Sequence, residues 1–537
     1  MTKVLFITPP YHCGVVEVAG RWIPLHLVYL AGSAREAGFD CEIYDAMSLD
    51  ASHAEIARVI ETTAPDIVAT SCITATYPDG LEIMKAAKAL GARTVMGGVH
   101  ASFMWREVLE EPGQPVDFVV QGEGEHSLPE LLTALRDGGD VAKVHGIAHR
   151  ENGSPESAPT RPWHKNLDGL PLAWDLLDWP TYTYFVYPGS RLGAISTSRG
   201  CMHGCTFCSQ QKFWNRSWRG RSPECVVDEL EHLRREHDVD VILLSDEYPT
   251  PDAPRWERFL DLVIERDLGQ KLLLETRVED VVRDEPILDK YVAAGVAHVY
   301  VGIEATDQET LDLINKDANV ESGIQALRLL YQHGIVSETS FVLGFPDETP
   351  EKIKRTLELS KTYDPDNAHY LAITPWPYTE LWNEMEPYIA SHDYRKYNLI
   401  DPVIRPKAMS LEDVDNAIVD CYRSFYTHKA VSVFTDTDSA RRDYMLRAMK
   451  LIMGSSFVRK KMMSGKGMPP EIRALLKKIG VVGVEEEALK LCPYSVKLDG
   501  DEDEVVQETL PETTRLGQQT QRLASASPAT ARSRRSR

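Results

Sequence analysis

Three closely spaced cysteines are the residues of this chain best suited to chemistry. Cys201, Cys205 and Cys208 have the spacing C-x3-C-x2-C. Cysteine thiolates are the usual ligands of iron–sulfur clusters. Three such ligands leave one iron of a four-iron cluster open to a small molecule. Gly200 and Gly204 favour a loop around a ligand, because glycine is costly inside a helix and permits a tight turn.

Two other interpretations of these cysteines stay open at this point. Residues four and seven apart can share one apolar face of a helix. The cysteines together with His203 can also form a zinc site, which normally has a fourth Cys or His at a defined spacing. A strand-like segment from Leu192 to Thr197 precedes the motif, and a long alternation of strands and helices follows it. The motif therefore lies where a strand-and-helix domain begins.

Composition limits the class of protein. A chain of 537 residues predicts two or three domains, and 43% hydrophobic with 26% charged residues is typical of a soluble globular protein. The net charge of −22 does not suit nucleic acid, whose phosphates need a basic surface. No apolar run reaches the ~18 residues of a membrane span, and the N-terminus lacks the regions of a signal peptide. Nine cysteines, six of them scattered singly, form no disulfide framework, so we expect a reducing cytoplasm.

Residues 1–140 are predicted to form a first α/β domain. Its strand-like runs are Val4–Thr8, Cys41–Tyr44, Ile67–Thr70, Thr94–Gly97 and Phe118–Gln121. Strands separated by helical stretches of ten or more residues predict a doubly wound parallel sheet. Ligands of such sheets bind at the carboxyl ends of the strands. We therefore expect a ligand at the loops that follow these five strands.

The rest of the chain divides into four parts. Residues 141–190, rich in Pro, Gly, Ser and Trp, are predicted to be a surface linker. Residues 191–400 alternate again, with strand-like runs at Gly193–Thr197, Val241–Ser245, Leu272–Arg277, His298–Ile303, Val336–Leu343 and His369–Thr374. Six such units are fewer than the eight of a closed barrel. Residues 401–500 carry helical signals, and residues 501–537 are predicted to be a disordered tail.

The three-cysteine motif, with Phe207 directly before its last cysteine, resembles the signature of the radical S-adenosylmethionine (SAM) enzymes. The resemblance implies a [4Fe-4S] cluster on Cys201, Cys205 and Cys208, with SAM on the fourth iron and Phe207 beside it. It also implies reductive cleavage of SAM to a 5′-deoxyadenosyl radical. The fold implied for residues 191–400 is a partial (β/α)6 barrel.

By the same resemblance, residues at the ends of the barrel strands contact SAM. Ser245, Asp246 and Glu247 stand where these enzymes usually have a Gly-Gly-Glu-like stretch for the SAM amino group, so this assignment depends on position and not on identity. Arg277 and Glu304 are placed for the SAM carboxylate and ribose, because an Arg can bind a carboxylate through two hydrogen bonds. A purely structural Arg277–Glu304 pair in the barrel mouth is the alternative.

The loops of the first domain resemble the cobalamin-binding domain that precedes many radical SAM domains. The residues implied in cobalamin binding are Ser71, Thr74, Gly97, Gly98, Val99, Gly122 and Glu123. The D-x-H-x-x-G motif that supplies a histidine to cobalt is absent, since Ala46 and Met47 follow Asp45. The resemblance thus implies cobalamin without that histidine on its lower face. A first domain that binds no cobalamin stays open as an alternative.

Over residues 1 to about 430, the resemblance extends to one subgroup, the anaerobic magnesium-protoporphyrin IX monomethyl ester oxidative cyclases of bacteriochlorophyll synthesis. The stretches that carry it are Ala19-Gly20-Arg21-Trp22, Tyr44-Asp45-Ala46-Met47, Ser196-Thr197-Ser198-Arg199-Gly200, Lys212-Phe213-Trp214, Thr374-Pro375-Trp376-Pro377 and Lys396-Tyr397-Asn398. The implied reaction builds the fifth ring of the pigment with oxygen taken from water. Trp376 and Tyr397 are expected to line the pocket of the flat porphyrin, and ordinary loop packing is the alternative.

Two rival functions stay open. A cobalamin-dependent radical SAM C-methyltransferase uses the same cofactors, so its motifs overlap almost entirely. A non-catalytic cobalamin or redox sensor is disfavoured by the intact cysteine motif and the polar strand ends. The expected partners are a porphyrin-like small molecule and a low-potential electron donor such as flavodoxin or ferredoxin.

Overall fold

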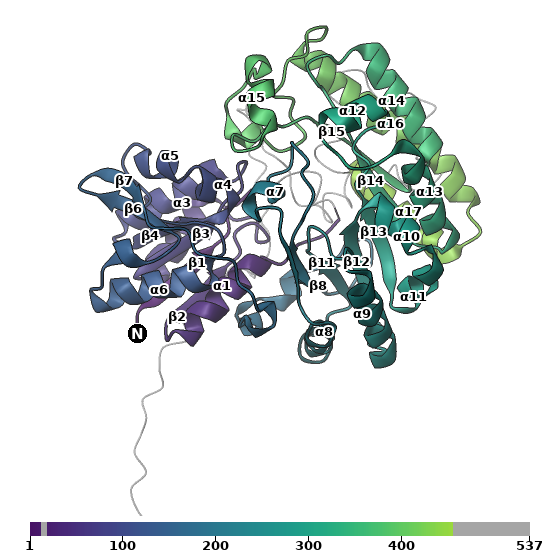
Figure 1. Cartoon of the computed structure of the whole chain (residues 1–537). Coiled ribbons are helices and arrows are strands. Elements are labelled where there is room, and N and C mark those ends of the chain that lie inside the picture. Colours follow the sequence, from purple (N-terminus) through teal and green to yellow (C-terminus); the bar gives the residue numbers. More distant parts are fainter. Residues whose placement is uncertain (12–18, 455–537) are drawn as a thin grey trace, which may run out of the picture.

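The computed structural model describes residues 1–11 and 19–454, which contain two large β-sheets lying side by side with helices around each (Figure 1). The part of the predicted helical region 401–500 that follows residue 454, and the predicted tail at 501–537, lie outside the described residues. Among the described residues, no helix has the length and apolar character needed to cross a membrane.

The first sheet has seven strands in the order β2-β1-β3-β4-β5-β6-β7. The first five pair in parallel, as predicted, and are β1 (Lys3–Ile7), β2 (Asp40–Tyr44), β3 (Ile67–Ser71), β4 (Arg93–Gly97) and β5 (Phe118–Val120). The order 2-1-3-4-5 is that of flavodoxin-like sheets, which bind ligands at the strands' carboxyl ends. The connecting helices are α1 (Leu25–Glu36), α2 (His53–Thr63), α3 (Tyr77–Ala89), α4 (Gly98–Phe103), α5 (Trp105–Glu110) and α6 (Gly124–Asp137).

Both faces of this sheet are buried, which explains why its strands are continuous apolar runs. Successive side chains of a strand point to opposite faces. In β1, Val4 and Phe6 belong to the core that includes residues of α1 and α6, whereas Leu5 and Ile7 belong to a second core with residues of α2 and α3. The doubly wound arrangement expected from the sequence is therefore confirmed.

The segment 141–190 differs from the surface linker that the sequence predicts. Its first part adds two antiparallel strands to the first sheet, β6 (Ile147–Glu151) and β7 (Ser154–Ser157). Its later part buries aromatic side chains in the main core, with Trp174 4% and Tyr182 2% exposed. The linker interpretation was wrong because large aromatic side chains gain much from burial. The later part of the segment instead packs in the interior.

The second sheet has six parallel strands in the order β15-β14-β13-β12-β11-β8. They are β8 (Leu192–Ile195), β11 (Val241–Leu244), β12 (Lys271–Thr276), β13 (Val296–Val301), β14 (Val336–Leu343) and β15 (Asn367–Ala372). The outermost strands β8 and β15 do not pair with each other, so the barrel is partial, as expected. Its helices include α8 (Pro223–His237), α9 (Ala253–Arg266), α10 (Val278–Arg283), α11 (Leu288–Ala293), α12 (Gln308–Leu313), α13 (Val320–Gln332) and α14 (Pro350–Tyr363) (Figure 1).

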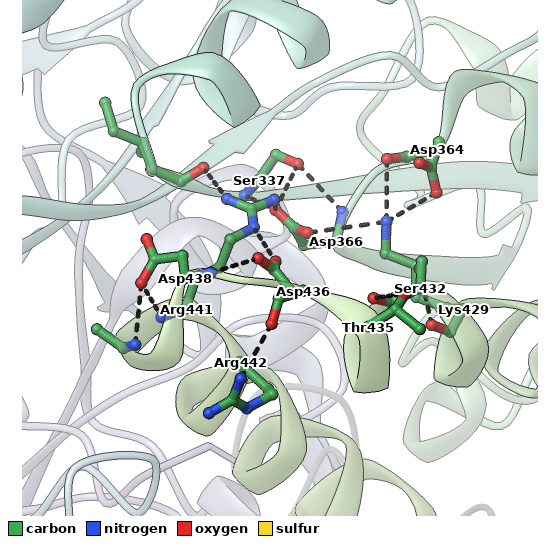
Figure 2. A network of polar contacts seen from close by, with 12 residues as sticks. Ser337, Asp364, Asp366, Lys429, Ser432, Thr435, Asp436, Asp438, Arg441 and Arg442 are labelled. Carbon is green, nitrogen blue, oxygen red and sulfur yellow. Dashed lines mark hydrogen bonds and ion pairs between the residues drawn. The ribbon is translucent and has the colours of Figure 1, made fainter.

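A buried polar network holds the C-terminal helices against the amino ends of β14 and β15 (Figure 2). These helices are α16 (Leu411–Thr435) and α17 (Ser439–Gly454). The Arg441 guanidinium donates to the Asp366 carboxylate, and both side chains are nearly inaccessible to solvent. Asp366 also accepts from the Ser337 N–H at 2.9 Å, and the Lys429 ammonium donates to Asp364 at 2.7 Å. The network lies at the opposite end of these strands from the carboxyl edge, so its role is structural.

Candidate active site between the two sheets

The three cysteines lie on an irregular loop whose start is fixed by a two-stranded ribbon. In this ribbon β9 (Ser198–Gly200) pairs antiparallel with β10 (Trp218–Gly220), and the short helix α7 (Gln210–Phe213) follows the loop. No helix spans Cys201 to Cys208, so the helix-face interpretation is excluded. Gly200 has φ +96°, and a Cβ there would lie 2.1 Å from the Ser217 carbonyl oxygen. Glycine is therefore required at the entrance of the loop.

The thiols are close enough to influence one another's charge. Burial, together with the charges of Cys205 and Cys201, raises the pKa of Cys208 to about 12. Burial also raises the pKa of Cys201. Thiolates in this loop therefore need positive charge close by, which a metal cluster provides on binding. The donor set fits an iron–sulfur cluster.

The zinc alternative finds no support in the arrangement of the described side chains. Across residues 1–11 and 19–454, no three His, Cys, Asp or Glu side chains are grouped closely enough to ligate one metal ion. His203, the candidate fourth ligand, lies 3.9 Å from Asp317 instead.

The carboxylate of Asp246, which the resemblance assigns to SAM binding, already accepts hydrogen bonds from other residues of the chain. It lies just after β11 and accepts hydrogen bonds from the Thr197 N–H and hydroxyl, both at 2.9 Å, and from the Ser198 hydroxyl. Burial raises the pKa of its carboxyl, which these hydrogen bonds counteract. Asp246 thus positions the chain that leads into the cysteine loop.

Glu247 also braces the cysteine loop. One carboxylate oxygen accepts from the Gly200 N–H at 3.1 Å, and the other accepts from the Trp214 indole at 2.8 Å. Burial raises the pKa of this carboxyl as well. Glu247 and Ser245 line a cavity, described below, whereas Asp246 does not. Within the stretch Ser245-Asp246-Glu247, Asp246 therefore has a structural role, whereas Ser245 and Glu247 lie on the cavity wall.

Arg277 and Glu304 do not form the structural pair considered as an alternative. The Arg277 guanidinium donates to the Asp317 carbonyl, and Glu304 accepts from the Lys316 ammonium at 3.1 Å. Arg277 shares a pocket of about 360 Å³ with His203 of the cysteine motif. It is therefore located next to the loop at which SAM is expected.

One cavity of about 420 Å³ joins the carboxyl edges of the two sheets. Its wall includes candidate residues that were predicted from the sequence to bind different cofactors. From the first sheet come Ser71, Gly97, Gly98, Gly122 and Glu123, and from the second come Ser245 and Glu247. Among these, Gly97 has room for a Cβ, which would lie in ordinary van der Waals contact with Val120 at 3.6 Å. The residues predicted to bind the corrinoid and those predicted to bind SAM thus line the same cavity.

Two arginines of the ribbon connect the sheets at this cavity. Arg199 donates to Glu123 at 2.9 Å and to Glu125 at 2.6 Å, and Arg219 donates to both oxygens of Glu123 at 3.0 Å. Burial alone would raise the pKa of Glu123, but the guanidinium groups of Arg219 and Arg199 hold it below its ordinary value. Glu123, expected to contact cobalamin, is therefore part of a clamp between the cysteine ribbon and the first sheet. Neither arginine is predicted from the sequence as a functional residue.

Two of the residues expected to bind cobalamin lie away from the cavity wall. Thr74 is fully buried, and its hydroxyl lies 2.9 Å from the Tyr378 hydroxyl and 3.2 Å from the His100 Nδ1. It joins the first sheet to the segment that follows β15. Val99 is half-buried in α4 and also does not line the cavity.

Tyr397, one of the two residues expected to contact substrate, lies in the protein core instead. Its side chain is 1% exposed, its hydroxyl donates to the Ser391 carbonyl at 3.0 Å, and its ring packs against Tyr394. Tyr397 is a core residue because this segment folds onto itself. Trp376 and Phe207 are half-buried at the edge of the same core. Neither Trp376 nor Tyr397 lines the cavity between the sheets.

Residues of α1 that were not predicted from the sequence as site residues also line the cavity. His26, Tyr29 and Leu30 lie on its wall and share one helical face. Enclosure lowers the pKa of His26 to about 4, with the charge of Glu125 opposing this shift, so the imidazole is neutral at physiological pH. The spacing of these residues in the sequence indicates a common face, but not which face meets a ligand.

Comparisons with known proteins agree with this division. A family model described as the B12 binding domain matches residues 11–132, and one described as the Radical SAM superfamily matches residues 195–360. The anaerobic magnesium-protoporphyrin IX monomethyl ester cyclase of Rubrivivax gelatinosus is 37% identical over 466 residues, which are 85% of this chain and 83% of that protein. An uncharacterized methyltransferase of Pyrococcus horikoshii is 32% identical over 80% of this chain and 94% of that protein.

A solved structure has a related architecture. The radical SAM methyltransferase TsrM from Kitasatospora setae, with cobalamin and a [4Fe-4S] cluster bound, gives a TM-score of 0.63 at 17% identity. The match covers 86% of this chain and 100% of that one. At this identity the likeness concerns the fold alone.

Proposed function

Because the chain belongs to the radical SAM enzymes that carry a B12-binding domain, we propose that it closes the isocyclic ring of magnesium-protoporphyrin IX monomethyl ester with oxygen from water. The observation that carries the proposal is the single cavity that joins the carboxyl edges of the two sheets. A reaction that combines a radical with corrinoid chemistry needs both cofactors to reach one substrate. The identity to the cyclase of Rubrivivax gelatinosus supports the choice of substrate.

The proposed ligands follow the geometry of the loop and cavity. When bound, the cluster and SAM supply a hydrogen-abstracting radical, and the corrinoid supplies one-electron or methyl-transfer chemistry. We propose that the cluster is held by Cys201, Cys205 and Cys208. The residues proposed to contact SAM are Phe207, Ser245, Glu247, Arg277 and Glu304. Those proposed to contact the corrinoid are Ser71, Gly97, Gly98 and Gly122.

The protein's own contribution is to position these ligands and to keep water out. Gly200 and Glu247 fix the course of the cysteine loop, and the Arg199 clamp holds this loop against the first sheet. Apolar side chains, including Leu25, Leu30 and Val120, cover part of the cavity wall. A reactive radical survives only where water and competing hydrogen donors are excluded.

Trp376 remains a proposed substrate contact, because its half-buried ring lies at the edge of the core that also includes Phe207 of the cysteine loop. Aromatic side chains give a flat macrocycle a large contact area at low entropic cost. We also propose that a small low-potential protein such as flavodoxin or ferredoxin supplies the electron for SAM cleavage.

The decisive assay supplies the porphyrin ester, SAM, cobalamin and a reductant to the cluster-loaded chain in oxygen-free 18O-labelled water. Ring closure with 18O in the new keto group supports the cyclase. A product methylated on carbon identifies a C-methyltransferase; the relative in Pyrococcus horikoshii is named as an uncharacterized methyltransferase. Accurate mass is needed, because adding one CH2 and oxidising one CH2 to C=O give the same nominal mass. Absence of 5′-deoxyadenosine under all conditions would refute both enzyme functions.

A further inference from the structure

The imidazole of His26, on the cavity wall, has no hydrogen-bond partner among the residues that the structure describes. The imidazole of His26 is exposed to the cavity near the start of α1. Among residues 1–11 and 19–454, no group forms a hydrogen bond or ring contact with it. Desolvation lowers the pKa of the ring to about 4, so the ring is neutral at physiological pH. A lone pair on one ring nitrogen is therefore available to a ligand.

Charged groups near His26 are already committed to other residues. The carboxylates of Glu123 and Glu125 are bound by Arg199. The carboxylate of Glu247 is bound by the Trp214 indole and the Gly200 N–H. The wall therefore presents paired charges and one unpaired neutral imidazole.

The position of His26 is held by its neighbours on α1. Tyr29, one helical turn further on, lies under the Arg199 guanidinium, whose carbon is 5.0 Å from the ring centre. The clamp that joins the two sheets thus also fixes the face of α1 that carries His26. A backbone position that is fixed in advance makes the binding of its side chain to a ligand less costly in entropy.

Neutral imidazole is the commonest nitrogen ligand of protein-bound metals. The surrounding wall includes the apolar side chains of Ile23, Leu25 and Leu30, which suit the face of a macrocycle. We propose that His26 donates a ring nitrogen to the cobalt of the bound corrinoid as an axial ligand. A Co–N bond forms, the bond from cobalt to the corrinoid's own base or to water breaks and releases that ligand, and the imidazole keeps the proton on its other nitrogen. The inference rests on corrinoid binding in the proposed function, and it replaces the expectation of a corrinoid without a protein histidine.

The test is electron paramagnetic resonance of the full chain labelled with 15N-histidine, loaded with cobalamin and reduced to Co(II). A protein imidazole on cobalt splits the signal as a 15N doublet, whereas the corrinoid's own base gives a 14N triplet and a cobalt without axial nitrogen gives neither. We expect the doublet in the wild type, its loss in His26→Ala, and its return as a triplet when unlabelled imidazole is added to that variant.

Two histidine variants serve as matched controls, His53→Ala on the surface of the first sheet and His12→Ala in the β1–α1 connection. Both are expected to keep the doublet. Cobalamin bound to the wild type without a doublet overturns the inference, as does a doublet that persists in His26→Ala or disappears in His12→Ala. If His26→Ala retains no corrinoid, a doublet in the wild type and in both controls still supports it, since no other described histidine lines the cavity. Failure of the wild type to retain cobalamin would instead refute the proposed function.

Discussion

At the residue scale, the cysteine loop depends on a few positions whose side chains or backbone have no substitute. The three thiols supply the donors, and Gly200 sets the direction in which the loop leaves the ribbon. Glu247 then fixes that direction through the Gly200 N–H. Gly200, which sets the direction of the loop, therefore directly precedes the first cysteine ligand.

Replacing Cys205 by Ala is expected to abolish cluster binding and SAM cleavage, because two cysteines cannot hold the cluster in place. The measurement is iron content after anaerobic reconstitution, together with 5′-deoxyadenosine formed from SAM. Cys225→Ala, near the start of α8, is the control and should keep both. Normal iron and SAM cleavage in Cys205→Ala would contradict the assignment of the cysteines.

Replacing Gly200 by Ala should destabilise the loop through a clash and through backbone strain. A Cβ at Gly200 would lie 2.1 Å from the Ser217 carbonyl oxygen, whereas at Gly189, which also has positive φ, it would meet no atom within 4 Å. We expect Gly189→Ala to cost about 1–2 kcal/mol from the left-handed conformation alone, and Gly200→Ala to cost more and to lower iron content. Thermal unfolding and iron assays of both variants check this. Equal effects of the two substitutions would show that the clash does not matter.

At the element scale, the C-terminal helices are attached at the end of the barrel that is remote from the cavity. The Arg441–Asp366 pair joins α17 to the start of β15, and Lys429 joins α16 to Asp364 (Figure 2). Side chains at the amino ends of barrel strands contribute to stability, and those at the carboxyl ends contribute to chemistry. Substitutions in this network should therefore change unfolding and leave ligand binding unchanged.

Asp366→Ala is expected to destabilise the barrel by up to about 3–5 kcal/mol, because the buried Arg441 then loses its main partner and keeps only the more distant Asp436 carboxylate, at 3.4 Å. The control is Glu224→Ala, which breaks an exposed pair with Arg258 of 3.1 Å. Exposed pairs contribute about 0–1 kcal/mol. Thermal unfolding of the two variants should differ clearly, with iron and corrinoid content unchanged in both. A small effect of Asp366→Ala would mean that water enters and solvates Arg441.

At the scale of the whole molecule, the two sheets are joined by polar contacts around the cavity. Arg199 and Arg219 of the cysteine ribbon hold Glu123 of the first sheet, and Tyr378 after β15 contacts Thr74 after β3. The loop that carries the cysteines and the loops assigned to the corrinoid are thus held in one arrangement. The relative position of the two cofactors would depend on these contacts.

The clamp predicts a specific pH dependence. The pKa of Glu123 is held below its ordinary value of 4.5 in the folded protein. Such a group contributes stability above its unfolded pKa, and this contribution is lost as the pH falls through the folded pKa. The difference in melting temperature between wild type and Glu123→Gln should be largest near neutral pH and shrink below about pH 4.5.

Glu130→Gln is a suitable control, because Glu130 pairs with Arg161 on the surface and is half exposed. Its effect on the melting temperature should be small throughout the same pH range. A difference for Glu123→Gln that is independent of pH would argue against an ionised Glu123 in the clamp.

The sequence alone determined the features that depend on local patterns. The cysteine spacing, the alternation of strands and helices, and the glycines after β4 all follow from neighbouring residues. They were sufficient to predict a doubly wound parallel sheet, a six-stranded partial barrel and the loops at the carboxyl edges, because the period of a strand or helix is a local property.

Only the tertiary structure decided which side chains meet. Arg199 and Glu123 are 76 residues apart, and Asp246 and Thr197 are 49 apart, so no local pattern pairs them. The same limit made Tyr397 look like a substrate contact and left His26 unnoticed. An aromatic or a histidine on one helical or loop face can meet a core, solvent or a ligand. Packing between distant segments determines whether such a side chain meets the core, solvent or a ligand. Burial of apolar surface is non-directional and depends on the whole fold.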